Sequence, residues 1–211
     1  MSKKPLEQCY LYLCTPYLKN NFFKFITQVV QNGVDIVQLR DKNLNDKDLL
    51  NIAKDLSQLL QELNTLFIVN DRVDLALLSN ADGLHLGQED LEPSVARQLL
   101  GEDKIVGLST HSRTQIINAL NQPVNYISVG PIAPTPTKPG RPGTGIGIIK
   151  DALQLSKLPF FITGAITPQK IIELKKFGSL RYVVVRYLTE STHPSTSAAE
   201  LKKALVNTQT T

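Results

Sequence analysis

Short hydrophobic runs alternate with segments of helical periodicity along the chain. Over residues 46–63, for example, apolar side chains recur every three or four positions, which is the period of an amphipathic helix. The pattern predicts eight strands, over residues 10–14, 35–39, 66–69, 83–86, 104–108, 126–129, 159–162 and 181–185. It predicts helices between and after them, over residues 21–31, 46–63, 72–78, 93–100, 113–120, 146–155, 168–177 and 198–206. Asn45, Ser112 and the pair Thr167-Pro168 are expected to begin three of these helices.

Strands that are separated by helices pair in parallel through right-handed crossovers. Eight such units predict an α/β fold, a single closed (β/α)8 barrel of the TIM type. The rival arrangement is an open doubly wound sheet, which the missing G-x-G-x-x-G motif after the first strand disfavours. No linker or change of composition divides the chain. We therefore expect one domain over residues 1–206 and a frayed tail over residues 207–211.

Composition and charge exclude several classes of partner. The net charge is only +4, and Lys and Arg never occur in runs longer than two, so no nucleic-acid partner is expected. No apolar run approaches the roughly 20 residues of a membrane span, and the polar first eight residues do not form a signal peptide. Cys9 and Cys14 are expected to be buried thiols in a reducing, cytoplasmic compartment.

The second predicted strand ends in an alternating polar face. Gln38, Arg40 and Lys42 share this face, while Val37 and Leu39 share the other. In a barrel of this type the apolar face meets the helices and the polar face meets the mouth, where the active site lies. Two cations at the mouth suit an anionic ligand, whereas the alternative is a solvated strand end with ordinary surface charges.

Carboxylates follow the third and fourth predicted strands. Asp71 comes after Asn70 at the end of one strand, and Asp90 follows the next strand. Carboxylates from neighbouring loops can hold Mg²⁺, which prefers oxygen ligands and also takes water and phosphate oxygens. The alternative for Asn70-Asp71 is a plain helix cap.

Two histidines stand near the same strand ends. His85 lies within the fourth strand, where a hydrogen-bonded histidine of the barrel interior is the simpler interpretation. Ser109 and His111 alternate onto one face after the fifth strand. His111 is a secondary candidate for an acid or base, because the sequence shows no carboxylate partner for it.

The sixth predicted strand opens into a segment rich in proline and glycine, over residues 130–145. So many prolines indicate a stiff loop, and the hydroxyls of Thr135 and Thr137 with the cation of Lys138 suit a phosphate. The alternative is a loop without function. Gly164 precedes a helix start after the seventh strand, where barrels often bind phosphate, although a plain turn fits equally well. Arg186, expected at the end of the eighth strand, could add charge there.

Five segments, in order and correctly spaced, resemble the thiamine-phosphate synthase family. They are Gln38-Leu-Arg-Asp-Lys42, Asn70-Asp-Arg-Val-Asp74, Asp82-Gly-Leu-His-Leu-Gly-Gln-Glu-Asp90, Gly107-Leu-Ser-Thr-His-Ser112 and Gly130-Pro-Ile-Ala-Pro-Thr-Pro-Thr-Lys138. The resemblance spans almost the whole chain. It implies a (β/α) barrel that joins hydroxymethylpyrimidine diphosphate to thiazole phosphate, giving thiamine phosphate and diphosphate with Mg²⁺ as cofactor.

The resemblance also implies roles for individual residues. Asp71 and Asp90 would hold Mg²⁺, and Gly164, Thr135 and Thr137 match positions near the thiazole phosphate. Residues that would contact the pyrimidine diphosphate are Gln38, Arg40, Lys42 and Asn70, with Ser109 and Lys138 on the diphosphate or pyrimidine side. The partners expected are thus two small molecules, and a homo-oligomer is left open.

Two positions depart from the family pattern, and two rival functions need to be weighed. Ala165 stands where the family usually has a second glycine, and Arg186 stands where it usually has serine. We expect Arg186 to support the thiazole phosphate by its charge. The rivals are a thiazole tautomerase and a non-catalytic barrel that binds a phosphorylated ligand. The predicted Mg²⁺ and diphosphate residues favour the synthase over both.

Overall fold

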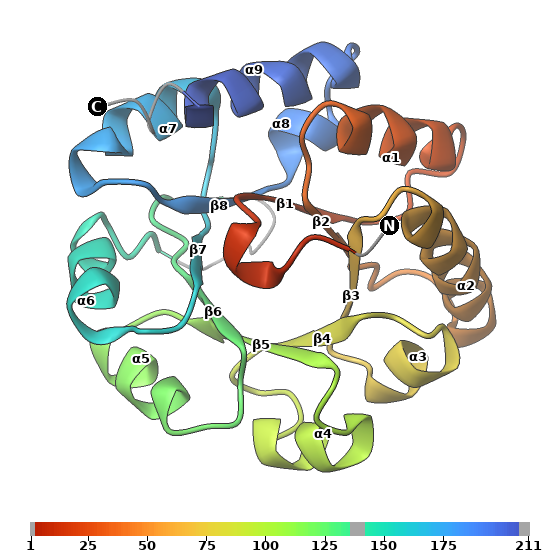
Figure 1. Cartoon of the computed structure of the whole chain (residues 1–211), viewed down its shortest axis with the longest axis horizontal. Coiled ribbons are helices and arrows are strands. Elements are labelled where there is room, and N and C mark those ends of the chain that lie inside the picture. The colour runs from red at the N-terminus through yellow and green to blue at the C-terminus, as the bar shows by residue number, and fades with distance from the viewer. Residues whose placement is uncertain (1–2, 136–141, 207–211) are drawn as a thin grey trace.

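The computed structural model describes residues 3–135 and 142–206 as a closed barrel of parallel strands inside a ring of helices (Figure 1). The strands are β1 (Leu11–Thr15), β2 (Ile36–Leu39), β3 (Leu66–Asn70), β4 (Gly83–Leu86), β5 (Ile105–Thr110), β6 (Tyr126–Val129), β7 (Phe160–Ile162) and β8 (Arg181–Val184). They pair in chain order, and β8 closes on β1. The predicted (β/α)8 barrel is therefore confirmed, and the open doubly wound sheet is wrong.

Helices connect successive strands on the outside of the barrel. They are α1 (Phe22–Gln31), α2 (Asp46–Glu62), α3 (Val73–Leu78), α4 (Pro93–Leu100), α5 (Arg113–Leu120), α6 (Gly147–Leu155), α7 (Pro168–Leu174), α8 (Arg186–Thr189) and α9 (Pro194–Val206). The three expected caps are confirmed, because Asn45, Ser112 and Thr167 each accept a backbone N–H of the first turn, at 3.0–3.2 Å. Within the described residues, no helix combines the length and the apolar character needed to cross a bilayer.

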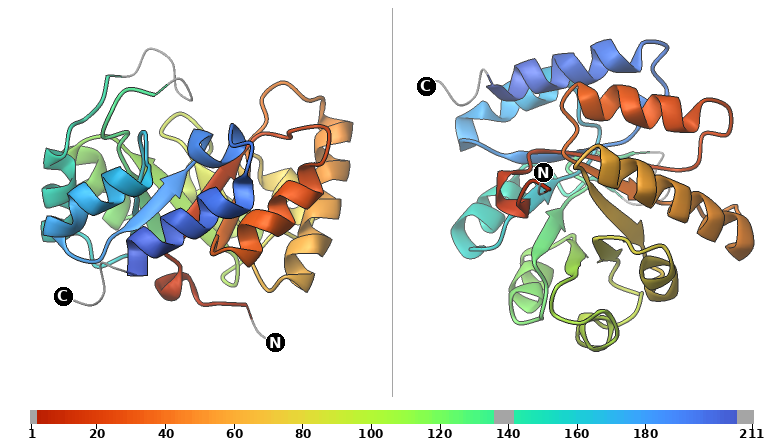
Figure 2. Two further views of the ribbon diagram at one scale, coloured as in Figure 1. Left: turned by 90° about the horizontal axis from the view of Figure 1, so that it is seen from above. Right: turned by 45° about the vertical axis from the view of Figure 1, so that its right-hand side comes forward.

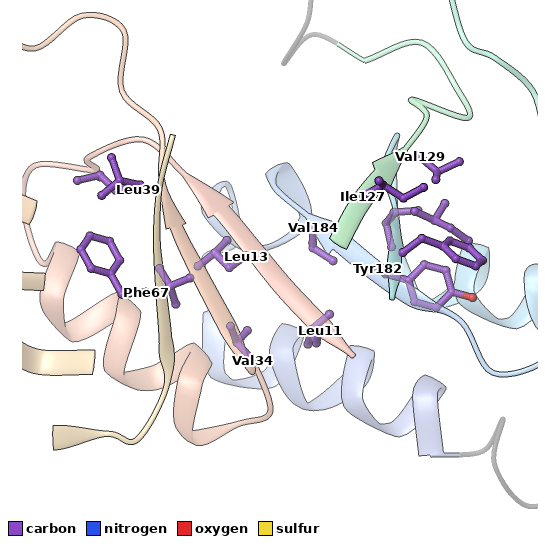
Figure 3. Packing of buried hydrophobic residues seen from close by; sticks show 14 of the residues in the cluster. Leu11, Leu13, Val34, Leu39, Phe67, Ile127, Val129, Tyr182 and Val184 are labelled. Atoms are coloured by element: carbon purple, nitrogen blue, oxygen red, sulfur yellow. The ribbon is translucent and has the colours of Figure 1, made fainter. Parts of the chain in front are cut away.

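Strand alternation divides the core into two layers. Outward side chains such as Leu13, Leu39 and Phe67 pack under the helices (Figure 3). Inward side chains such as Tyr12, Ile68 and Phe161 fill the barrel. Towards the carboxyl ends of the strands, the inward positions become polar, and Gln38, His85, Ser109 and Ser128 are all buried there. This change of polarity along the barrel axis places a polar floor beneath the mouth.

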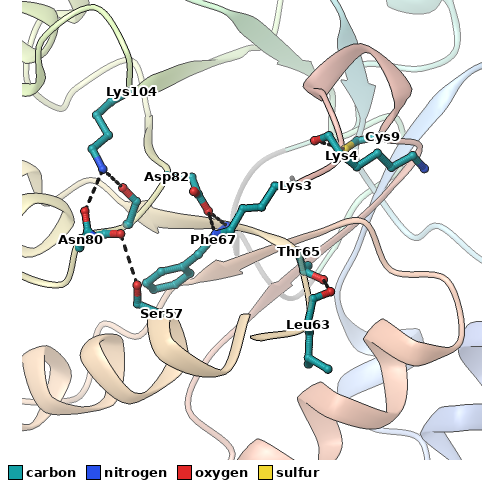
Figure 4. Close-up of polar contacts among 11 residues, drawn as sticks. Lys3, Lys4, Cys9, Ser57, Leu63, Thr65, Phe67, Asn80, Asp82 and Lys104 are labelled. Carbon is teal, nitrogen blue, oxygen red and sulfur yellow. Dashed lines mark hydrogen bonds and ion pairs between the residues drawn. The ribbon is translucent and has the colours of Figure 1, made fainter. Parts of the chain in front are cut away.

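The opposite end of the barrel is covered by the N-terminal segment. A short 3₁₀ helix, η1 (Leu6–Gln8), lies across this end (Figures 1 and 2). Lys3 pairs with Asp82 at 2.6 Å, and that carboxylate also accepts the backbone N–H of Phe67 at 2.7 Å (Figure 4). Lys4 pairs in the same way with Asp35 at 2.7 Å. The end opposite the mouth is thus closed by charge pairs anchored at the starts of strands.

Several boundaries differ from the expected ones near the C-terminus. β8 ends at Val184 and Arg186 begins α8, because Val185 (φ −125°, ψ −90°) leaves the extended conformation. The expectation that Arg186 ends a strand is therefore wrong. The last helix begins at Pro194 rather than residue 198, since proline at a first helical position needs no N–H partner. The end of the helix predicted over residues 168–177 is a separate 3₁₀ turn, η2 (Lys175–Phe177).

Candidate active site

A cavity of about 620 Å³ opens at the carboxyl ends of the strands, within the size range of small-molecule sites. Thr137 and Lys138, which the sequence also predicts for the site, lie outside the described residues. The structure brings the other twelve predicted site residues to the lining of this cavity: Gln38, Arg40, Lys42, Asn70, Asp71, His85, Asp90, Ser109, His111, Thr135, Gly164 and Arg186.

Asp71 and Asp90 form a pair of carboxylates at one side of the cavity. They come together because β3 and β4 are neighbours, with Asn70 opposite His85 in the register. Burial, together with a hydrogen bond and repulsion from Asp90, raises the pKa of Asp71 to about 6. Burial also acts to raise the pKa of Asp90, but hydrogen bonds from Asp71 and from Gly87 N–H, at 2.6 Å, hold it below its usual value. Below about pH 6 Asp71 therefore holds a proton next to the ionised Asp90, and above this pH the two carboxylates repel each other.

Local backbone geometry holds this pair in place. Asp71 has a left-handed conformation (φ +62°), which aspartate tolerates better than most residues. The next residue, Arg72, bonds Asp74 and also spans to Asp46 at the start of α2, at 2.7 Å. Arg72 is the N-cap of α3 and no side chain caps that helix, so the alternative that Asn70-Asp71 is a plain cap is wrong.

Cations lie next to the acidic pair on the same rim. Lys42 is 3.7 Å from the Asp71 carboxylate and remains largely exposed, with 64% of its side chain accessible. Arg40, which is two residues before Lys42, also lines the cavity. Gln38, Arg40 and Lys42 thus project inward, while Val37 and Leu39 are buried under the helices. One side of the cavity therefore carries both carboxylates and cations. A site that binds a metal ion together with an anionic ligand needs both.

The chemistry of this rim fits Mg²⁺. Among the described residues, no cluster of three or more His, Cys, Asp or Glu side chains forms a cage for a metal. Mg²⁺ does not need one, because it commonly binds through one or two carboxylates and completes its shell with water and substrate phosphate. The raised pKa of Asp71, caused by burial and by the neighbouring Asp90, marks a place where a cation would relieve repulsion.

Hydrogen bonds connect several side chains at the floor of the cavity. His85 is buried and contacts Tyr126 Oη through Nδ1 and Ser109 Oγ through Nε2, both at 2.9 Å. The interpretation of His85 as a hydrogen-bonded interior histidine is therefore confirmed. Gln88 reaches over from the β4–α4 loop and donates to the Ser109 carbonyl at 2.6 Å. His111 Nδ1 donates to the Gly130 carbonyl, so a backbone group orients this ring.

The far side of the cavity is built from the turn after β7. Gly164 has φ +108°, and a Cβ there would come within 2.6 Å of Ile132 N, so only glycine fits. Ala165 follows in the left-handed region (φ +51°), where a second glycine would be unstrained. This turn leads into α7 through the Thr167 cap. Arg186 faces it from α8, where its Nε contacts Glu190 at 2.6 Å.

Sequence reasoning missed several side chains that line the cavity. Tyr12, Cys14 and Ser128 point inward from β1 and β6, and Cys14 donates to Gln38 Oε1 at 3.4 Å. The signal for them was the strand alternation, since Tyr12 and Cys14 share a face, as do Tyr126 and Ser128. Glu190, the partner of Arg186, carried no comparable signal, because its position depends on the unforeseen α8.

A closed barrel with a carboxylate pair, cations and buried hydroxyls at the carboxyl ends of its strands defines the class of (β/α)8-barrel enzymes. Residues 11–188 match the family described as thiamine monophosphate synthase. The chain belongs to this family of enzymes, which confirms the resemblance seen in the sequence motifs.

Individual relatives carry the same description. The chain is 41% identical over 196 residues to the thiamine-phosphate synthase of Synechocystis sp., covering 93% of this chain and 57% of that protein. It is 39% identical over 207 residues to that of Acidothermus cellulolyticus, covering 96% and 98% respectively. The structure of thiamine phosphate pyrophosphorylase from Pyrococcus furiosus superposes with a TM-score of 0.86 at 26% identity, covering 95% of this chain and 96% of that one. The chain thus spans just over half of one relative and nearly all of another.

Proposed function

We propose that this chain joins 4-amino-5-hydroxymethyl-2-methylpyrimidine diphosphate to thiazole phosphate, releasing diphosphate and forming thiamine phosphate. The family and its relatives support a thiamine-phosphate synthase. The cavity supports the particular substrates, because it offers a mixed-charge rim, a polar floor and a far side lined by Gly164 and Arg186 within one space. Two small molecules, each carrying phosphate, would fill these parts.

The mixed-charge rim is proposed to bind the diphosphate. Arg40 and Lys42 would contact its oxygens, since guanidinium and ammonium groups form strong charge-assisted hydrogen bonds with phosphate. Asp71 and Asp90 would hold Mg²⁺, which when bound supplies positive charge next to the departing diphosphate. Lys138, outside the described residues, stays a predicted contact of the same group.

The aminopyrimidine is proposed to bind at the floor of the cavity, and the thiazole phosphate at the far side. Gln38, Asn70 and Ser109 are proposed to hold the aminopyrimidine at the floor. Thr135, Gly164 and Arg186 are proposed to hold the thiazole phosphate, together with Thr137, which lies outside the described residues. Held in this way, the thiazole nitrogen would face the methylene carbon that carries the diphosphate, and this alignment lowers the entropic part of the barrier.

The proposed chemistry needs no protein nucleophile. The C–O bond breaks with its electron pair leaving on the diphosphate, and the electron-rich aminopyrimidine stabilises the resulting methylene cation. The thiazole nitrogen then donates its lone pair to that carbon and forms the C–N bond. His111 is given no part in this scheme, and its Nδ1 donates to the Gly130 carbonyl. The barrel would act by positioning and by charge stabilisation.

The observation that carries this proposal is the Asp71–Asp90 pair lying beside Lys42 in the same cavity. The test is a coupled assay of diphosphate release with both substrates, with Mg²⁺ or with EDTA, on the wild type and Asp90→Ala. We expect a loss of about 10²–10³-fold for the variant, as for removal of one group that stabilises transition-state charge. Asp55→Ala, an exposed carboxylate on α2, is the matched control and should keep full activity.

The outcome separates the rival functions. A barrel that only binds a phosphorylated ligand would release no diphosphate, and a thiazole tautomerase would not require both substrates. Equal diphosphate release by the wild type and Asp90→Ala, or release that EDTA does not change, would refute the metal assignment.

A further inference from the structure

A chain of hydrogen bonds crosses the barrel interior and ends at the cavity floor. Gln38 Nε2 donates to Tyr12 Oη at 2.6 Å, and Tyr12 Oη lies 2.9 Å from Tyr126 Oη. Tyr126 Oη lies 2.9 Å from His85 Nδ1, and His85 Nε2 lies 2.9 Å from Ser109 Oγ. The chain thus links side chains of β2, β1, β6, β4 and β5 in one line.

The amide of Gln38 determines in which direction the hydrogen bonds of this series run. An amide nitrogen only donates, so Tyr12 accepts from Gln38. Either hydroxyl could donate in the Tyr12–Tyr126 contact, but the buried Tyr12 hydrogen meets an acceptor when it points at Tyr126 Oη. Tyr126 has then accepted one hydrogen and must give its own to His85 Nδ1. A neutral imidazole that accepts at Nδ1 carries its hydrogen on Nε2, which points at Ser109.

This direction of hydrogen bonding requires that both Tyr12 and Tyr126 remain protonated. Tyr12 and Tyr126 are fully buried, and burial raises the pKa of each well above the ordinary value for tyrosine. Neither phenol therefore ionises at physiological pH, and each passes on a single hydrogen.

A glycine in the neighbouring strand makes room for the ring of Tyr126. Gly107 on β5 lies opposite Tyr126 in the register, and a Cβ on that glycine would come within 2.1 Å of Tyr126 Cζ. The glycine lets the phenol pass over β5 to reach His85, with the two ring centroids 5.5 Å apart and nearly parallel. The contact between Tyr126 and His85 therefore depends on glycine at position 107.

We propose that Tyr126 is a positioning residue, which holds His85 as the Nε2–H tautomer and thereby turns the Ser109 hydroxyl hydrogen into the cavity. Ser109 Oγ accepts from His85 and, at 3.4 Å, from Ser128, so its own hydrogen is left for a ligand. The acceptor it would meet is a ring nitrogen of a heterocycle. This last step rests on the proposed function, in which the floor holds the aminopyrimidine.

The tautomer is tested without any substrate. Imidazole ¹⁵N shifts distinguish the two neutral tautomers, and the chain has only three histidines to assign. We expect the Nε2–H form of His85 in the wild type. Tyr126→Phe should give a mixture of tautomers, and Tyr12→Phe should as well, because it removes the hydroxyl that directs the Tyr126 hydrogen to Nδ1. Tyr182→Phe, a buried tyrosine outside the barrel interior, is the control for loss of a phenol. An Nδ1–H form in the wild type would overturn the proposal, and this measurement needs no variant.

The effect on the ligand is tested by kinetics. Tyr126→Phe should raise KM for the pyrimidine diphosphate about tenfold, the worth of one hydrogen bond, and leave KM for thiazole phosphate unchanged. A tautomer change without this KM change would overturn the link to Ser109. If the wild type releases no diphosphate from the two substrates, the proposed function fails, while the tautomer result still stands or falls by itself.

Discussion

Asp71→Asn should stabilise the metal-free protein above pH 6 and abolish its response to Mg²⁺. The pKa of Asp71 is raised in the folded protein to about 6, so the native state holds a proton that the unfolded chain has already lost. A carboxyl group of this kind reduces the free energy of unfolding as pH rises from about 4 through about 6. Asparagine removes the charge, and it also tolerates the left-handed backbone at this position (φ +62°).

The size of the effect follows from the shift. Each pKa unit corresponds to about 1.36 kcal/mol, so a rise from 3.8 to about 6 sets an upper limit of about 3 kcal/mol. The lowered pKa of Asp90 and the 23% exposure of the Asp71 side chain reduce this to about 1–2 kcal/mol. For a chain of this length we expect a rise in Tm of roughly 2–8 °C at pH 8, vanishing near pH 4.

Thermal unfolding in EDTA and in Mg²⁺, from pH 4 to pH 8, measures both parts. Mg²⁺ should raise the Tm of the wild type at pH 8 and leave that of Asp71→Asn unchanged. Asp74→Asn is the matched control, because the pKa of Asp74 is lowered by its bond to Arg72 and its loss should slightly lower Tm. If Asp71→Asn is no more stable than the wild type at pH 8 in EDTA, the ionised Asp71 does not destabilise the folded protein as described.

Three further substitutions test the site. Ala165→Gly should stabilise by about 0.5–1 kcal/mol in urea unfolding, because it removes a side chain from the left-handed region; a loss of stability would contradict this. Gly107→Ala should cost about 1–3 kcal/mol and change the near-UV circular dichroism, since its Cβ would meet the Tyr126 ring; an unchanged spectrum would show that the ring is placed otherwise. Arg186→Ala should raise KM for thiazole phosphate about tenfold and leave KM for the pyrimidine diphosphate unchanged. An unchanged KM for thiazole phosphate would refute a role for this charge.

The sequence predicted what depends on local periodicity and on strand order. Alternation placed Gln38, Arg40 and Lys42 on an inward face, and the order of strands placed Asp71 near Asp90. Contacts across the barrel were not predictable in this way. The approach of Tyr126 to His85 depends on which inward side chains meet at one height of a closed barrel, and on the room left by Gly107.

The C-terminal region was missed for a different reason. The prediction continued the eighth strand to its last β-branched residue, but Val185 turns out of the extended conformation and Arg186 begins a helix. Nothing in the local pattern distinguishes these two outcomes, because Val184 and Val185 have the same strand propensity. The final position of Arg186, facing the cavity beside Glu190, depends on tertiary packing.

The closed end of the barrel, opposite the mouth, determines how this enzyme can be attached to a partner or a support. Lys3 pairs with Asp82 just before β4, and Lys202 near the end of α9 packs against Gly33 just before β2. Both ends of the described chain therefore emerge on the side away from the cavity (Figure 2). A fusion partner or an immobilising support attached at either end would leave the entrance for substrates unobstructed.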